Sequence, residues 1–201
     1  ADGMAFILQN ECLASGATGG GLGYDGFPGS SIAVEFDIYA NQGLFSDGDK
    51  TDPNFDHLAI HRDGNTDHLN ANNLAGPVMM HSTKSDVEDD IWYDFEIRYS
   101  VNTKILEVFF DGSLRISHTI NIKNDVFSGG EGAFWGFTAS TGSKVANHRL
   151  FIEPTKDLSK DTICNGETST IIFPEVTGAV TNSALNKPVD TWTLPASGGP
   201  P

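Results

Sequence analysis

Four polar side chains recur at every second position of one short segment of the sequence. In residues 34–41, Glu35, Asp37, Tyr39 and Asn41 alternate with apolar residues. Side chains of a strand alternate between its two faces, so as a strand this segment presents all four on one face. Two ionised carboxylates crowded together repel each other unless a cation or hydrogen bonds compensate them. The spacing alone is compatible with a metal site or with solvated acids on an exposed face.

Two further candidate ligands follow after a loop. Asp52 supplies another carboxylate and His57 an imidazole. Carboxylate and carbonyl oxygens suit Ca²⁺, whereas an added imidazole suits Mn²⁺ or another transition-metal ion. The alternative is that Asp37 or Asp52 caps a turn. The other histidines with no evident pattern are interpreted as surface or satisfied-core residues: His61, His68, His81 and His118.

Short strands must position these residues. Apolar side chains recur at every second position in 106–110 and 116–122, which predicts strands with one buried face. Asp111-Gly112-Ser113 between two such runs predicts a hairpin. Only residues 83–90 could hold a helical turn. We otherwise expect no helix and predict an antiparallel β-sandwich or jelly roll. Its expected strands are residues 4–9, 32–39, 57–61, 92–100, 105–111, 114–122, 133–139 and 148–152.

Composition excludes several classes of protein. The 201 residues include 12 Lys+Arg against 27 Asp+Glu, a net charge of -15, which argues against nucleic acid and anionic membranes as partners. No stretch approaches the ~20 apolar residues of a membrane span, so we expect no membrane insertion. The 13 phenylalanines supply enough apolar surface for a folded core.

The composition changes after residue 153. Six of the nine prolines lie beyond it: Pro154, Pro174, Pro188, Pro195, Pro200 and Pro201. We therefore predict a β-sandwich domain over 1–153 and, over 154–201, a Pro-rich linker or the start of a small β-module with strands at 168–173 and 190–194. Cys12 and Cys164 lack zinc-site spacing, and whether they pair is left open.

Several blocks occur in an order that identifies a family. They are Ala1-Asp2-Gly3, Gly19-Gly20-Gly21, residues 34–41, Asp52-Pro53 with His57, Trp92-Tyr93-Asp94, Trp135-Gly136-Phe137 and His148. Over roughly residues 1–152 the chain resembles the L-type (legume-type) lectins, especially their bacterial extracellular relatives. The resemblance implies an all-β, antiparallel ConA-like β-sandwich. In that family several strands precede the Ala-Asp-Gly block, so we expect this chain to lack the N-terminal strands of the fold.

The resemblance also implies a pair of metal ions. Glu35 and His57 would ligate the Mn²⁺-type ion, and Asp37 and Asp52 would bridge it to Ca²⁺. The backbone carbonyl of Tyr39 and the side chain of Asn41 would complete the Ca²⁺ site.

The sugar-binding residues that the resemblance implies lie mostly in loops. Asp2, after a peptide bond that is cis in relatives, would hold the sugar hydroxyls together with Asn41, and Tyr39 would stack on the ring. A backbone amide of Gly20 or Gly21 would complete these contacts, because glycine lets the backbone approach a ligand closely. The loop 140–144, which includes Ser143 and Lys144, would tune which sugar fits.

Together these features predict a metal-dependent, non-enzymatic carbohydrate-binding module of a secreted or cell-surface protein. Its partners would be surface glycans or polysaccharides, its role adhesion, and it would have neighbouring domains in a larger adhesin, because residues 161–168 resemble the start of Ig-like repeats. One rival is a glucanase-type glycoside hydrolase, but its Glu-x-Asp-x-x-Glu motif has Ala40 at the third acidic position. The other is a structural sandwich that has lost sugar binding.

Overall fold

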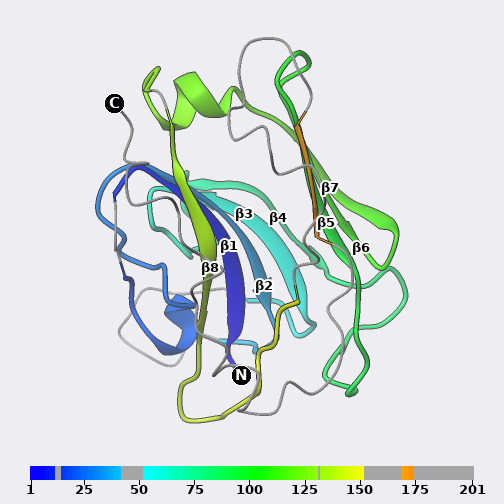
Figure 1. Cartoon of the computed structure of the whole chain (residues 1–201). Helices are drawn as coiled ribbons and strands as arrows, with labels where there is room; N and C mark the ends of the chain where they lie inside the picture. Colours follow the sequence, from blue (N-terminus) through cyan, green and yellow to red (C-terminus); the bar gives the residue numbers. More distant parts are fainter. Residues whose placement is uncertain (12–14, 42–51, 131, 152–168, 174–201) are drawn as a thin grey trace.

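Two antiparallel sheets packed face to face make up the fold (Figure 1). The structure is a computed structural model that describes residues 1–11, 15–41, 52–130 and 132–151, and the backbone of 169–173. The first sheet has the order β4-β3-β2-β1-β8 and the second β7-β6-β5-β9. The strands are β1 (Gly3–Gln9), β2 (Ser31–Asp37), β3 (His57–Arg62), β4 (Asn73–Met79), β5 (Phe95–Ser100), β6 (Ile105–Phe110), β7 (Ser113–Thr119), β8 (Phe134–Ser140) and β9 (Ser169–Phe173). The predicted antiparallel β-sandwich is confirmed.

The main core fills the space between the sheets. Alternation along β2 turns Val34 and Phe36 towards the second sheet, where they join Ile97 and Val108 in one buried apolar cluster. All seven residues of β2 are buried, so its opposite face is covered as well. The cover is the segment between β1 and β2, whose Leu22, Tyr24 and Phe27 pack on Ala5, Ile7 and Ala33 in a second cluster. This second face carries Glu35 and Asp37.

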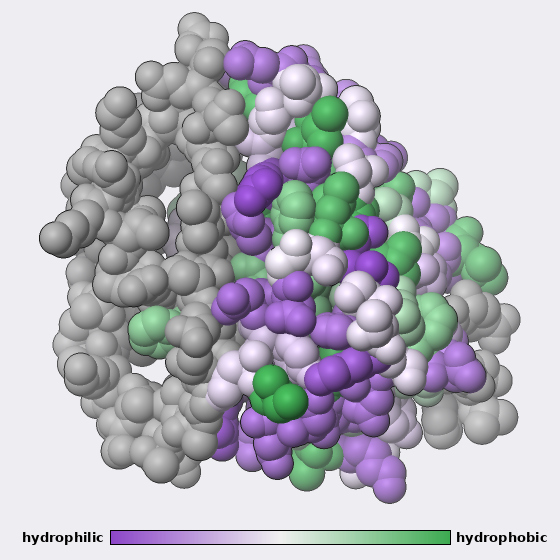
Figure 2. Space-filling model, turned by 90° about the vertical axis from the view of Figure 1, so that its right-hand side faces the viewer, coloured by the Kyte–Doolittle hydropathy of each residue, from purple (hydrophilic) through white to green (hydrophobic). Residues whose placement is uncertain are grey.

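The β6–β7 hairpin forms where the sequence predicted it. Asp111 and Gly112 both have positive φ values, 47° and 69°, as a tight two-residue turn between twisted strands requires. Figure 2 shows the side of the molecule where β6 and β7 lie, with polar and apolar residues interspersed on its surface. There the guanidinium of Arg98 lies 4.3 Å from the centre of the Phe109 ring, so that a charged side chain covers an outward-facing aromatic one.

Several local predictions were wrong or incomplete. Strand β4 was not predicted, and the expected strand at 148–152 is irregular over its described residues, 148–151. Residues 83–90 form bends rather than a helical turn, whereas a 3-10 turn forms at Gly19–Gly21 and a π-helical turn at Ile122–Val126. No helix among the described residues is long and apolar enough to span a membrane.

The C-terminal region contributes one described strand. β9 lies within the predicted strand 168–173 and pairs antiparallel with β5. The second strand predicted there, at 190–194, and both Cys12 and Cys164 lie outside the described residues. The division into 1–153 and 154–201, and the absence of N-terminal strands from this chain, stay predictions.

Candidate functional site

The register of β2 and β3 brings the predicted metal ligands together. Asp37 lies opposite His57, and Glu35 lies opposite Ala59. Alternation then places His57, Ala59 and His61 on the face of β3 that adjoins Glu35 and Asp37. The small side chain of Ala59 leaves room between the two imidazoles. All four polar side chains are buried.

The carboxylate of Glu35 is the centre of this cluster. Its Oε2 accepts a 2.8 Å hydrogen bond from the hydroxyl of Tyr24, on the covering segment. Its Oε1 faces imidazole nitrogens, with Nε2 of His61 at 3.3 Å and Nε2 of His57 at 3.6 Å. Tyr24 therefore fixes one oxygen of Glu35 and leaves the other pointing into the cluster.

His68 also enters the cluster, from the connection between β3 and β4. Its Nε2 lies 2.9 Å from Nε2 of His57, 3.3 Å from Oδ1 of Asp52 and 3.5 Å from Oε1 of Glu35. Among the described residues there are two sets of three whose donor atoms all lie within 4.8 Å of one another. They are Glu35–His61–His68 and Asp52–His57–His68. The interpretation of His61 and His68 as ordinary surface or core residues missed their place here.

The charges in the cluster are strongly coupled. Burial raises the pKa of Asp37 well above its usual range, and the neighbouring charge of Glu35 adds to this. Burial alone would raise the pKa of Glu35 too, but the imidazoles, His61 first, hold it well below its usual range. Burial lowers the pKa of His57, yet its hydrogen bond to Glu35 and the surrounding carboxylates raise it overall. A cation would relieve this repulsion between carboxylates, so the donor set fits a metal ion.

A second group of oxygens lies beyond Asp37. The amide nitrogen of Tyr39 donates to Oδ1 of Asp37 at 2.7 Å, and that of Asn41 donates to Oδ2 of Asp52 at 2.7 Å. The side-chain oxygen of Asn41 faces only acceptors. If the Asn41 amide were turned over, its nitrogen would donate to the Tyr39 carbonyl at 3.3 Å and to Oδ2 of Asp52 at 3.2 Å. A convergence of amide, carbonyl and carboxylate oxygens is also the ligand set of a hard cation such as Ca²⁺.

Asp2 lies beside this oxygen group. The peptide bond Ala1–Asp2 is cis. The Asp2 backbone is tied to β8 by a 3.0 Å hydrogen bond from its amide to the Ser140 carbonyl, and it accepts one at 2.9 Å from the amide of Ile38. Its side chain is buried, with 3% of the residue exposed. Burial raises its pKa, which outweighs the hydrogen bonds from Asn41 and Gly142. Its Oδ2 has no hydrogen-bond partner among the described residues.

Glycines allow one loop to approach Asp2 and another to approach Asn41. A Cβ on Gly142 would lie 3.0 Å from Oδ2 of Asp2, and one on Gly20 would lie 2.8 Å from Oδ1 of Asn41. A Cβ on Gly21 would instead meet Ala17, at 2.8 Å. Of the two predicted glycines, Gly20 is therefore the one whose backbone adjoins Asn41.

The remaining predicted residues lie at the rim. Tyr39 has 37% of its surface exposed, which leaves its ring open to a ligand. Ser143 and Lys144 are both exposed and follow directly after Gly142. The structure thus brings together Asp2, Gly20 and Asn41, with Tyr39, Ser143 and Lys144 outside them.

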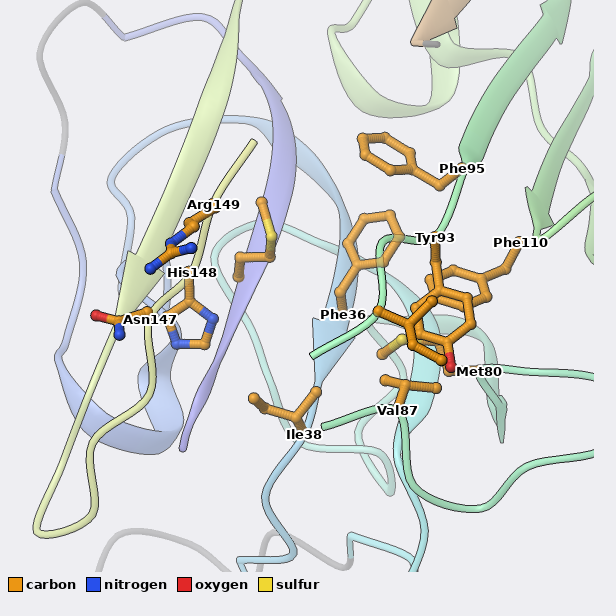
Figure 3. A pocket seen from close by; sticks show the side chains of 12 residues that line it. Phe36, Ile38, Met80, Val87, Tyr93, Phe95, Phe110, Asn147, His148 and Arg149 are labelled. Carbon is orange, nitrogen blue, oxygen red and sulfur yellow. The ribbon is translucent and has the colours of Figure 1, made fainter. Parts of the chain in front are cut away.

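The structure has a separate, apolar pocket of about 160 Å³ between the two sheets (Figure 3). Phe36 and Ile38 line it, so it lies on the face of β2 opposite to Asp37. Its other walls are mainly core side chains such as Tyr93 and Phe110, with Asn147, His148 and Arg149 on the side of β8. None of its lining residues is a predicted metal-binding or sugar-binding residue, so this pocket is not the candidate site.

Fold and site together define a ConA-like sandwich with a buried carboxylate–imidazole cluster at the end of one sheet. Comparison with known families agrees, because the family described as the legume lectin beta-barrel domain matches residues 1–153. The chain belongs to this L-type lectin domain family.

A solved structure shares the fold. The crystal structure of basic winged bean lectin with Tn-antigen matches with a TM-score of 0.50 and 24% sequence identity over 71% of this chain. The match covers 53% of that lectin, so the chain spans about half of its length. At this identity the likeness shows the fold alone.

Proposed function

We propose that this chain is a metal-dependent carbohydrate-binding module with its sugar site at Asp2. The family assignment supports a carbohydrate-binding, non-enzymatic protein. The observation that carries the location is Oδ2 of Asp2, a buried carboxylate oxygen without a partner among the described residues. A buried acceptor left unpaired costs about 1–3 kcal/mol, and a ligand hydroxyl would satisfy it.

A chain of contacts links the sugar site to the metal cluster. The side chain of Asn41 lies close enough to Asp2 to lower its pKa, and the backbone amide of Asn41 donates to Asp52. The other oxygen of Asp52 lies 3.3 Å from Nε2 of His68. Bound Ca²⁺ and a transition-metal ion would neutralise the buried carboxylates. Asp52 would then stay in place and hold Asn41, and Asn41 would in turn orient Asp2. Metal removal should therefore weaken sugar binding.

The proposed contacts follow from the placement of the residues. Asp2 would accept from sugar hydroxyls, the Asn41 side chain and the Gly20 amide would complete the polar contacts, and Tyr39 would cover an apolar ring face. Ser143 and Lys144, next to Gly142, would select among sugars. We also propose a glycan partner on a cell surface or polysaccharide, an extracellular location and a role in adhesion, as the resemblance to bacterial extracellular lectins implies.

A glycan array with purified protein tests this proposal. We expect binding that is lost with a chelator and restored by Ca²⁺ with Mn²⁺. Asp2→Asn keeps the shape of the side chain but removes its charge and one acceptor, so it should abolish binding while the protein still takes up metal. The matched control is Asp63→Asn, because Asp63 is exposed and its carboxylate lies 3.5 Å from the guanidinium of Arg62. Binding by Asp2→Asn at the wild-type level would overturn the site. Release of reducing ends from a β-glucan would overturn the non-enzymatic role.

A further inference from the structure

We propose that His68 is a direct ligand of the transition-metal ion, together with His57, Glu35 and Asp52, and that this second imidazole widens the preference of the site for Zn²⁺ over Mn²⁺. The inference rests on the proposed metal-dependent function. It goes beyond the resemblance, which assigns a single imidazole, that of His57, to this ion. The evidence is the placement of four donor atoms, their supporting contacts and the chemistry of imidazole.

The four donor atoms are spaced as ligands of one small ion. Ligands at the 2.0–2.1 Å bond lengths typical of Zn²⁺ lie about 2.9 Å apart at octahedral right angles and about 3.3–3.4 Å apart in a tetrahedron. The observed separations from Nε2 of His68 are 2.9 Å to His57, 3.3 Å to Asp52 and 3.5 Å to Glu35. Glu35 and His57 are 3.6 Å apart. These four separations are close to those between ligands of one ion, and the donor atoms of Asp52, His57 and His68 all lie within 4.8 Å of one another.

Other groups hold two of these donors, His57 and Glu35, in a ligating orientation. Nδ1 of His57 lies 3.3 Å from the carbonyl of Phe55 and can only donate to it, which leaves Nε2 with a free lone pair towards the cluster. The hydroxyl of Tyr24 holds Oε2 of Glu35, so that Oε1 faces the imidazoles. Such outer contacts are typical of metal ligands.

His61 makes fewer contacts with the other donor atoms than His68 does. Its Nε2 has one short contact, 3.3 Å to Oε1 of Glu35, whereas Nε2 of His68 contacts Glu35, Asp52 and His57. We therefore assign His61 as a residue that orients Glu35 and His68 as a ligand.

The donor set decides the metal preference. Imidazole nitrogen suits Zn²⁺, Cu²⁺ and Ni²⁺, whereas carboxylate, carbonyl and water oxygens suit Mn²⁺. All four side chains are buried, so protein atoms rather than solvent surround the ion. Replacing an oxygen ligand by the imidazole of His68 moves the site towards the nitrogen-preferring ions.

One alternative arrangement uses the same contacts without a metal. The 2.9 Å separation of the His57 and His68 nitrogens would then be an N–H···N hydrogen bond inside a purely structural polar cluster. That arrangement predicts no dependence of metal choice on His68.

Metal titrations distinguish the two arrangements. Wild-type protein and the variants His68→Asn and His61→Asn are stripped with a chelator. Each is then titrated with Zn²⁺, Mn²⁺ and Co²⁺ against a chromophoric competitor, and thermal unfolding checks that the variants fold. We expect His68→Asn to lose more Zn²⁺ affinity than the roughly 10- to 100-fold typical of losing a supporting residue. Its Zn²⁺/Mn²⁺ affinity ratio should fall as well. His61→Asn, the matched control, should lose no more than that range and keep the ratio.

The visible absorption spectrum of bound Co²⁺ gives an independent readout of the ligand set. It should change in His68→Asn and keep its band positions in His61→Asn. An unchanged affinity ratio and spectrum in His68→Asn would overturn the inference, while chelator-sensitive glycan binding would leave the proposed function intact. If the wild type binds none of the three ions, the inference about His68 and the proposed metal-dependent function both fail. Should His68→Asn not fold, a wild type that binds Mn²⁺ as tightly as Zn²⁺ overturns the inference by itself.

Discussion

The hydroxyl of Tyr24 offers the most direct test of how the covering segment supports the cluster. It is fully buried and donates 2.8 Å to Oε2 of Glu35. Tyr24→Phe removes the donor and leaves a buried carboxylate oxygen unpaired, and hydrogen bonds to charged groups contribute about 1.5–3 kcal/mol. The 153 residues of the matched domain have an unfolding entropy of roughly 0.3 kcal/mol/K. The expected loss of melting temperature is therefore about 5–9 °C.

The assay is thermal unfolding followed by circular dichroism, in the presence of a chelator so that metal occupancy does not vary. Tyr93→Phe is the matched control, because it deletes a hydroxyl whose two partners lie at the surface: it donates 2.6 Å to the carboxylate of Asp89 and accepts from the ammonium of Lys84. Water can replace both bonds, so their loss should cost below about 1 kcal/mol, near 3 °C. Equal losses in the two variants would refute the reasoning that the Tyr24–Glu35 bond supports a buried charge.

Two further predictions concern the surroundings of the site. Burial raises the pKa of Asp56 from 3.8 to about 6, so the folded state holds this proton more tightly than the unfolded chain. The resulting stabilisation is complete below pH 3.8 and lost as the pH rises through 6, and urea unfolding of Asp56→Asn across this window should show a flatter pH dependence than wild type. Gly20→Ala places a Cβ 2.8 Å from Oδ1 of Asn41, so array binding should fall while the melting temperature changes little. Undiminished array binding would contradict the assignment of Gly20.

Alternation in the sequence was sufficient to predict the faces of strand β2. The alternation in 34–41 predicted that Glu35 and Asp37 share a face, and β2 shows this arrangement opposite His57. Strand β4 escaped prediction because Pro77 argues against a strand. As an edge strand β4 accommodates it, after a cis Gly76–Pro77 bond, because an edge leaves one side of the backbone without partners.

The two extra histidines differ in how far the sequence could reveal them. His57 and His61 are four positions apart on β3, so strand alternation already places both on one face, and that signal was available. His68 lies in an irregular connection, where no periodicity links it to Glu35. Only the folding of that connection back onto β3 brings its Nε2 to within 3.5 Å of Glu35.

One covering segment serves both halves of the candidate site. Residues 15–30 bury Leu22, Tyr24 and Phe27 on the outer face of the first sheet, and the same segment carries Gly19 and Gly20 to the neighbourhood of Asp2 and Asn41. Tyr24 reaches Glu35 from this segment, and the hydroxyl of Ser140 on β8 donates 2.6 Å to the Gly19 carbonyl. Any loss of order in the candidate metal cluster would therefore act on the proposed sugar site by two routes. One passes through Asp52 and Asn41, and the other through Tyr24 and the glycine turn. Because the second route does not pass through Asp52, Tyr24→Phe should also weaken glycan binding in the presence of metal.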